Sequence, residues 1–274
     1  MPKTEKIRSM FDSIAGDYDR LNHLMSLGVD RRWRRVALRY LVPPGGRPGR
    51  SDLRREREGP DCAAERERRY ERGPTALGGA ASPDAQERPA ILDIACGTGD
   101  FAIAAARAFP QAQVTGMDLS EGMLSVMEGK VARAGLGGRI STLQGDCTRM
   151  HFDNGAFDCA TIAFGIRNFE DRPAALREIL RVLRPGGRLV ILELSVSSNK
   201  ALRRLYKLYF CHLMPWIGGL ISGDRAAYRY LPASVLAFPG PGEWMQVMRD
   251  AGFTDVVHRA LSLGLCRLYV GVKP

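Results

Sequence analysis

From residue 90 onward the sequence alternates between short apolar runs and segments with helical periodicity, which restricts the chain to few folds. The expected strands are residues 90–95, 113–118, 139–144, 157–163 and 188–194, and the expected helices are residues 99–109, 120–134, 173–183 and 241–251. Residues 254–259 and 265–272 are expected to form a terminal strand pair. Strands and helices in alternation predict an α/β fold with a parallel sheet and right-handed crossovers.

The region before residue 90 has a different pattern. Residues 3–14, 17–27 and 30–41 carry apolar side chains at helical spacing, with Asp30 as the expected N-cap of the third helix. Residues 45–89 then hold 10 arginines, 9 acidic residues, 7 glycines and 5 prolines, with few large apolar side chains. Such a segment cannot bury enough surface to offset its ordering entropy, so we expect a mostly disordered insertion.

A loop containing two glycines follows the first strand of the alternating region. Gly97 and Gly99 allow a ligand to approach the backbone closely. A glycine loop that leads into a helix normally suits a phosphate. Here Asp93 lies at the end of the strand and Asp100 opens the helix. Two carboxylates disfavour a pyrophosphate and favour a ligand with a cationic or amine-bearing end.

The ends of the next two strands indicate a nucleoside. Asp118 stands 19 residues after Gly99, where an acidic side chain accepts hydrogen bonds from ribose hydroxyls. A ribose, a cation and a free amino group together describe S-adenosylmethionine. After the third strand, the Asp146 carboxylate is suited to an adenine amino group and the Cys147 backbone N–H to a ring nitrogen, although a structural turn explains Asp146 equally well. Met123 either packs on the adenine or belongs to the core.

Four further segments are residues 11–22 with Ser26 and Trp33, residues 164–168, residues 181–195 and residues 228–231. With the glycine loop they resemble class I S-adenosylmethionine-dependent methyltransferases and, more closely, the ubiquinone/menaquinone-biosynthesis C-methyltransferase family. The resemblance covers the chain except residues 45–89. It implies a Rossmann-like fold with a mostly parallel seven-stranded sheet whose last strand is antiparallel, N-terminal helices and a helical cover over the site.

The resemblance also implies how the chain is organised. We expect one methyltransferase domain over residues 1–274. Its parts are N-terminal helices (1–44), the insertion (45–89), a cofactor-binding core (90–195), and substrate-covering helices with the terminal strand pair (196–274).

The cofactor that the resemblance implies is S-adenosyl-L-methionine. The expected binding residues are Asp93, Gly97, Thr98, Gly99, Asp118, Met123, Asp146, Cys147 and Ala163. The family commonly has a serine where this chain has Ala163, so we expect that contact to come from the backbone alone.

The catalytic residues are expected near the end of the fourth strand. Ionisation of a quinol hydroxyl makes the adjacent ring carbon nucleophilic, and the protein must align the ring, exclude water and stabilise the phenolate. Arg167 is the expected stabiliser, Asn168 is expected to orient the ring oxygen, and Tyr18 is expected to cover the substrate. His212 is either a base or a structural residue.

The family's substrate is a polyprenylated quinol. The aromatic, basic residues 202–221 either offer a wall for the isoprenoid tail, with arginines facing lipid headgroups, or form a buried helix. The net charge of +10 favours an acidic partner, and contact with a membrane surface fits it. The polar N-terminus and the lack of a long apolar run predict a cytoplasmic protein, peripheral on the membrane at most. The sequence is also compatible with a homo-oligomer.

The same residues disfavour several other functions. No cysteine pair has CxxC spacing, so no metal site is expected. A methyltransferase that acts on amino groups of nucleic acids usually has the four-residue motif Asn/Asp-Pro-Pro-aromatic after the fourth strand, and residues 164–167 do not match it. Methylation of cytosine C5 needs a cysteine nucleophile in that loop, whereas Cys159 lies inside the strand. No nucleic-acid partner is therefore expected. Asp93 and Asp100 disfavour an NAD-dependent oxidoreductase, and the complete loop disfavours a non-catalytic quinone-binding protein. Between the two quinone pathways, residues 237–239 and 264–269 favour methylation of demethylmenaquinol over the methoxybenzoquinol of the ubiquinone pathway.

Overall fold

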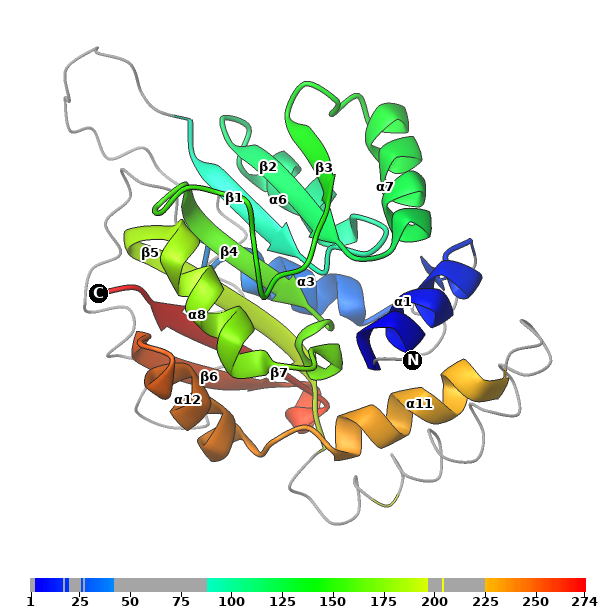
Figure 1. Ribbon diagram of the computed structural model, residues 1–274, viewed down its shortest axis with the longest axis vertical. Coiled ribbons are helices and arrows are strands. Elements are labelled where there is room, and N and C mark those ends of the chain that lie inside the picture. The colour runs from blue at the N-terminus through cyan, green and yellow to red at the C-terminus, as the bar shows by residue number, and fades with distance from the viewer. Residues whose placement is uncertain are drawn as a thin grey trace.

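The computed structural model describes residues 3–16, 18–19, 26, 28–41, 88–196, 204 and 225–274. Within these residues, seven strands form one sheet in the order β3-β2-β1-β4-β5-β7-β6 (Figure 1). The strands are β1 Ala90–Ile94, β2 Gln113–Asp118, β3 Ile140–Gln144, β4 Phe157–Ala163, β5 Leu183–Leu194, β6 Thr254–Leu261 and β7 Cys266–Val272. Strands β1 to β5 pair in parallel, and β7 runs antiparallel to both β5 and β6. The predicted fold class is therefore confirmed.

Helices cover both faces of this sheet. They are α1 Lys3–Ile14, α3 Asp30–Leu38, α6 Asp100–Ala108, α7 Glu121–Arg133, α8 Arg172–Val182, α11 Arg225–Leu236 and α12 Pro241–Asp250, with the short 3-10 turns η2 Ile166–Asn168 and η4 Ser262–Gly264. Side chains of α3, α6 and α7 share one core cluster, and those of α8 and α12 share the other. Figure 1 shows α1 and α11 beside the edge where the parallel strands end.

Several helix ends follow the capping rules that the sequence suggests. Ser120 is the N-cap of α7, and its hydroxyl accepts a hydrogen bond from the Met123 N–H at 3.1 Å. The expectation that Asp30 caps α3 is wrong, because Val29 holds the N-cap position. Asp30 is instead the first residue of the helix, and its carboxylate accepts from the Ser26 hydroxyl at 2.6 Å and pairs with Arg34 one turn on. These local partners occupy the oxygens that a cap would need.

Residues 184–187, which separate the expected helix 173–183 from the expected strand 188–194, are part of β5. β5 begins directly after α8, and its pairing with β4 passes from Phe157 opposite Leu183 to Cys159 opposite Arg188. The intervening residues form a bulge, in which Gly186 has a φ of +78°. A side chain at Gly187 would come within 2.7 Å of a backbone oxygen, so the close approach of the chain there requires glycine.

Some of the predicted segments lie outside the described residues, and one observed helix was not predicted. The helix expected at residues 17–27 is described only in part, and residues 45–87 of the expected insertion and all of 199–222 except Arg204 are outside the description. Helix α11, which the sequence pattern did not predict, carries Pro232 in its interior. No helix in the described ranges has the length and apolar character needed to span a bilayer.

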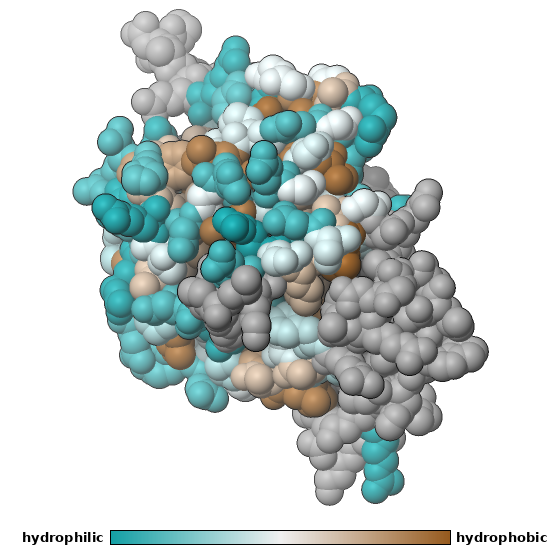
Figure 2. All heavy atoms as spheres, turned by 45° about the vertical axis from the view of Figure 1, so that its right-hand side comes forward, coloured by the Kyte–Doolittle hydropathy of each residue, from teal (hydrophilic) through white to brown (hydrophobic). Residues whose placement is uncertain are grey.

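The described surface is largely polar. Figure 2 shows mainly hydrophilic side chains on the face it presents, with apolar ones in small scattered groups. Among described residues, the exposed large apolar side chains are Leu143, Leu236 and Leu263.

Candidate active site

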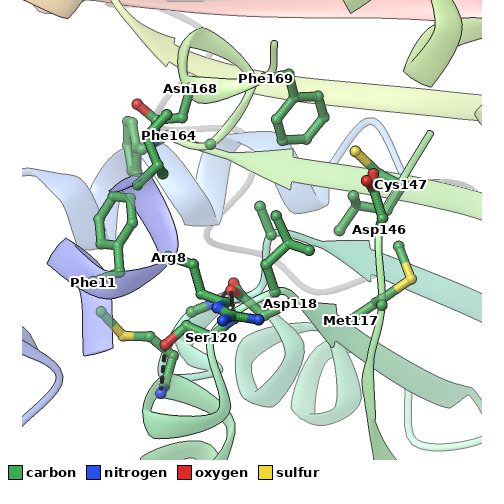
Figure 3. Close-up of a pocket in the computed structure, with 18 of the residues that line it drawn as sticks. Arg8, Phe11, Met117, Asp118, Ser120, Asp146, Cys147, Phe164, Asn168 and Phe169 are labelled. Atoms are coloured by element: carbon green, nitrogen blue, oxygen red, sulfur yellow. Dashed lines mark hydrogen bonds between the residues drawn. The ribbon is translucent and has the colours of Figure 1, made fainter. Parts of the chain in front are cut away.

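The carboxyl ends of the parallel strands border a hollow of about 860 Å³, solvent space included. Loops after β1, β2, β3 and β4 line one side, and α1 lines the other (Figure 3). Strands that run in parallel end at the same edge, which is why residues far apart in the sequence meet here. Of the residues expected at the site, those lining the hollow are Tyr18, Gly97, Asp118, Met123, Asp146, Cys147, Ala163 and Asn168.

A second, smaller hollow of about 350 Å³ adjoins the first and shares Tyr18, Gly97 and Ala163 with it. Asp93 and Thr98 line this second space. The structure therefore brings most of the expected residues to one region. Gly99 and Arg167 line neither hollow.

Asp118 holds the junction between the glycine loop and the second crossover. Its Oδ2 accepts a hydrogen bond from the Gly97 N–H at 2.8 Å, and its Oδ1 accepts from the Ser120 N–H at 2.9 Å. Burial raises the pKa of Asp118, and hydrogen bonds from the backbone of Ser120 and Gly97 oppose that rise. The carboxylate is thus fixed in place with lone pairs left for further donors, as a ribose contact requires.

Asp93 is buried in the strand end below the smaller hollow. It is 1% exposed, and its Oδ1 accepts from the Thr161 hydroxyl at 2.7 Å. Its Oδ2 makes no hydrogen bond of normal geometry within the described part of the chain. Burial raises the pKa of Asp93 to about 7, while the Thr161 hydrogen bond, the charge of Arg34 and the backbone N–H of Ala102 oppose the rise. A buried carboxylate oxygen lacking a donor fits a ligand that brings a cation or an amino group.

The glycine loop owes its shape to backbone angles that side chains rarely adopt. Gly97 has a φ of +55° and Gly99 a φ of +80°. A Cβ at Gly99 would come within 2.4 Å of the Met127 side chain, so this glycine serves the packing of α6 against α7. Gly97 instead lines both hollows. The two glycines expected at the site therefore have different tasks, one toward the ligand and one toward the core.

The far end of the larger hollow is suited to a flat apolar ring with polar edges. Figure 3 shows Asp146 and Cys147 on the side opposite Phe11 and Phe164. One oxygen of Asp146 accepts from both the N–H and the hydroxyl of Thr148, each at 2.8 Å. Burial raises the pKa of the Cys147 thiol to about 12, so it stays neutral.

Three further residues expected to contact the cofactor differ in their surroundings. Met123 is 1% exposed yet lines the hollow, so its side chain belongs to the core and to the site wall at once. Ala163 lines both hollows and, as expected, has no hydroxyl to offer. The hydroxyl of Thr98 is already bonded to Asp19.

Aromatic side chains gather on the side of the hollow nearest α1. Figure 3 shows Phe11, Phe164, Asn168 and Phe169 around this part of the space. Phe11 packs edge-on against Tyr18 with ring centroids 6.0 Å apart. The Asn168 amide oxygen accepts from the Tyr230 hydroxyl of α11 at 3.0 Å, which fixes the orientation of the amide. This half of the hollow suits a second aromatic molecule.

The sequence predicts Arg167 at the site, but Arg167 does not line the hollow. It is 7% exposed, and its guanidinium pairs with Glu193 of β5 at 3.0 Å and donates to Ser234 of α11 at 3.2 Å. Burial acts to lower the pKa of Arg167, but the charge and hydrogen bond of Glu193 together with the nearby Tyr18 and Tyr230 outweigh it, and the pKa is raised. The strand end places Arg167 near the site, but the buried Glu193 pairs with its guanidinium, and Arg167 lines neither hollow.

The wall contributed by α1 was missing from the sequence-based site. Ile7, Arg8 and Phe11 line the larger hollow. Ile7 and Phe11 are four residues apart, which places them on one face of the helix. This periodicity was visible in the sequence, but it does not say which partner the face covers.

The chain matches a known protein family over most of its length. The model of the ubiE/COQ5 methyltransferase family matches residues 1–49 and 80–273. The interruption falls within the stretch that the sequence predicts to be an insertion.

Individual relatives match almost the whole chain. A demethylmenaquinone methyltransferase of Bacteroides fragilis is 38% identical over 271 residues, covering 99% of this chain and 94% of the relative. One from Thermus thermophilus is 40% identical over 265 residues, covering 97% of this chain and 100% of the relative. A ubiquinone/menaquinone biosynthesis C-methyltransferase UbiE of Geobacter sulfurreducens is 40% identical over 273 residues, covering 99% of this chain and 90% of the relative.

Solved structures share the fold at lower identity. A chain in the complex between the Haloferax volcanii Trm112 methyltransferase activator and a methyltransferase has a TM-score of 0.59 at 17% identity, covering 96% of this chain and 97% of that chain. The S-adenosylmethionine-dependent methyltransferase SibL has a TM-score of 0.50 at 24% identity, covering 71% of this chain and 53% of that chain. At these identities the likeness concerns the fold alone.

Proposed function

The chain belongs to the ubiE/COQ5 methyltransferase family, and from this premise we propose that it methylates a ring carbon of demethylmenaquinol to give menaquinol. That it is an S-adenosylmethionine-dependent C-methyltransferase of quinone biosynthesis follows from the family itself. The choice of quinol is supported by the relatives named demethylmenaquinone methyltransferase. The methoxybenzoquinol of the ubiquinone pathway is the second candidate, because the relative from Geobacter sulfurreducens carries the double name.

The observation that carries the proposal is the continuity of the larger hollow. One end offers Asp118 and Asp146 to a nucleoside, and the other offers Phe11 and Phe164 to an aromatic ring. A methyl transfer needs donor and acceptor in one water-poor space with the reacting atoms aligned. A single hollow with a polar end and an aromatic end meets this requirement.

The chain's own residues supply binding and orientation. When bound, S-adenosylmethionine supplies an electrophilic methyl group on its sulfonium. In the proposal, Asp118 holds the ribose and the free oxygen of buried Asp93 receives the cationic amino-acid end. Asn168, held by Tyr230, orients a ring oxygen of the quinol, and Tyr18 covers the ring.

Arg167 has a different part in this proposal from the one its position after β4 suggests. Its guanidinium donates to the Phe164 carbonyl as well as pairing with Glu193, so it fixes the loop that carries Phe164 and Asn168. We therefore treat it as a positioning residue whose buried positive charge acts on the ring oxygen from behind the loop. Contact with the membrane surface, where the tail of the quinol resides, belongs to the same proposal.

The proposal is tested with purified protein and S-adenosylmethionine carrying a labelled methyl group. Demethylmenaquinol and the methoxybenzoquinol, each with the same short prenyl tail, are compared by kcat/KM after chromatographic separation of the products. We expect label in menaquinol with at least about tenfold preference, since a few contacts differ between the rings. Transfer to the benzoquinol alone would favour the second candidate, and transfer to RNA but to neither quinol would refute both.

A further inference from the structure

Lys130 of α7, which is not among the expected cofactor contacts, donates to three acceptors. Its ammonium donates to Asp19 Oδ2 at 2.6 Å, to the Thr98 hydroxyl at 3.3 Å and to Asp100 Oδ1 at 2.5 Å. A lysine has three N–H donors, so all of them are used. The Thr98 hydroxyl in turn donates to the other oxygen of Asp19.

These groups join three separate parts of the chain. Thr98 and Asp100 belong to the glycine loop and the start of α6, Lys130 to α7, and Asp19 to the N-terminal segment. The side chains of Lys130, Asp19 and Asp100 are 18%, 30% and 25% exposed, so solvent screens them only in part. Arg34 lies 3.7 Å from the other oxygen of Asp100, but Lys130 is the cation that Asp19 and Asp100 share, and without it the two carboxylates would repel across a partly buried space.

Asp19 directly follows Tyr18, the residue that faces the ligand space. Its neighbour Tyr18 lines both hollows, and a Cβ at Gly97 would lie 3.8 Å from the Tyr18 ring. The N-terminal segment has a second attachment at Asp12, which accepts from the Ser120 hydroxyl at 2.5 Å and from the Gly122 N–H at 3.2 Å. Ser120 is also the donor to Asp118. Both attachments thus end on loops of the cofactor site.

We propose that Lys130 is a positioning residue that closes the N-terminal segment over bound S-adenosylmethionine by holding Asp19, and with it Tyr18, against the glycine loop. This inference rests on the proposed function in one respect only, namely that Tyr18 covers a quinol. Its effect on the cofactor follows from the contacts with Thr98 and Gly97 alone. Closure by this contact keeps the cofactor in place and completes the substrate half of the hollow.

The test compares Lys130→Met with Arg133→Met, which removes a cation from an exposed position near the end of the same helix. Isothermal titration measures the affinity for S-adenosylmethionine, and hydrogen exchange measures the opening of peptides that contain Tyr18 and Asp19. We expect Lys130→Met to bind about tenfold more weakly, because a charged hydrogen-bonded group is lost. We also expect faster exchange in those peptides, with Arg133→Met unchanged in both measurements.

Two further variants separate positioning from a general loss of structure. Lys130→Arg keeps the charge and should restore affinity to within about threefold. Adding Asp19→Asn to Lys130→Met removes the repulsion and should bind more tightly than Lys130→Met alone. Unchanged binding and exchange in a folded Lys130→Met protein would overturn the proposal, as would a lowered melting temperature without local opening. Neither readout depends on the quinol, so failure of the proposed substrate would leave this result intact.

Discussion

Replacing Asp93 with asparagine should make the ligand-free protein more stable at neutral and alkaline pH while weakening its hold on the cofactor. Burial raises the pKa of Asp93 from its ordinary 3.8 to about 7. Between these two values the folded chain holds a proton that the unfolded chain has lost, so this group's contribution to stability falls as pH rises. Asparagine keeps the shape and an acceptor for the Thr161 hydroxyl but does not ionise.

The size of the effect follows from the two pKa values. Each pKa unit corresponds to about 1.36 kcal/mol, so ionising Asp93 in the folded protein costs roughly 4 kcal/mol once the pH is well above 7. Part of this cost is already present at pH 5. Between pH 5 and pH 8 the wild-type chain should therefore lose about 2.5 kcal/mol relative to Asp93→Asn.

Urea unfolding of both ligand-free proteins at pH 5, 6, 7 and 8 measures the difference directly. The expected result is a gap in unfolding free energy that widens with pH in favour of Asp93→Asn. Saturating S-adenosylmethionine should narrow or reverse the gap, because the cation compensates the carboxylate only in the wild type. A gap that stays constant from pH 5 to pH 8 would refute the reasoning, since Asp93 would then ionise at its ordinary pKa.

Three further substitutions test other contacts. Asp118→Ala should weaken cofactor binding by about 1.5–3 kcal/mol in isothermal titration, since a charged acceptor is lost; unchanged affinity would exclude the ribose contact. Arg167→Ala should lower the unfolding free energy by about 3–5 kcal/mol, because Glu193 at 0% exposure loses its partner. Adding Glu193→Gln should recover part of the lost unfolding free energy. No recovery in urea unfolding would contradict the claim that the unpaired Glu193 causes the loss. Gly99→Ala should cost about 1–3 kcal/mol through its positive φ and the contact with Met127, and an unchanged melting temperature would count against it.

Much of the fold could be predicted because the sequence pattern in the core is local and unambiguous. The bounds of β2 and β4 agree with those expected from the sequence. The glycine loop between two acidic residues indicated a cationic nucleoside ligand through side-chain chemistry alone. That Asp93, Asp118 and Asp146 come together then followed from the rule that parallel strands end at one edge.

What the sequence could not determine is which way a side chain turns once its backbone is placed. Arg167 stands after β4 as expected, yet Glu193, 26 residues further along the chain, draws its guanidinium away from the hollow. The amphipathic face of α1 was readable, but only docking through Asp12 made it a wall of the site. Sequence by itself determined the succession of strands and helices along the chain and the chemistry at the strand ends, because neighbouring residues encode both. Tertiary structure alone decided the pairing of Lys130 with Asp19 and of Arg167 with Glu193, because each depends on burial and charge between segments brought together only by folding.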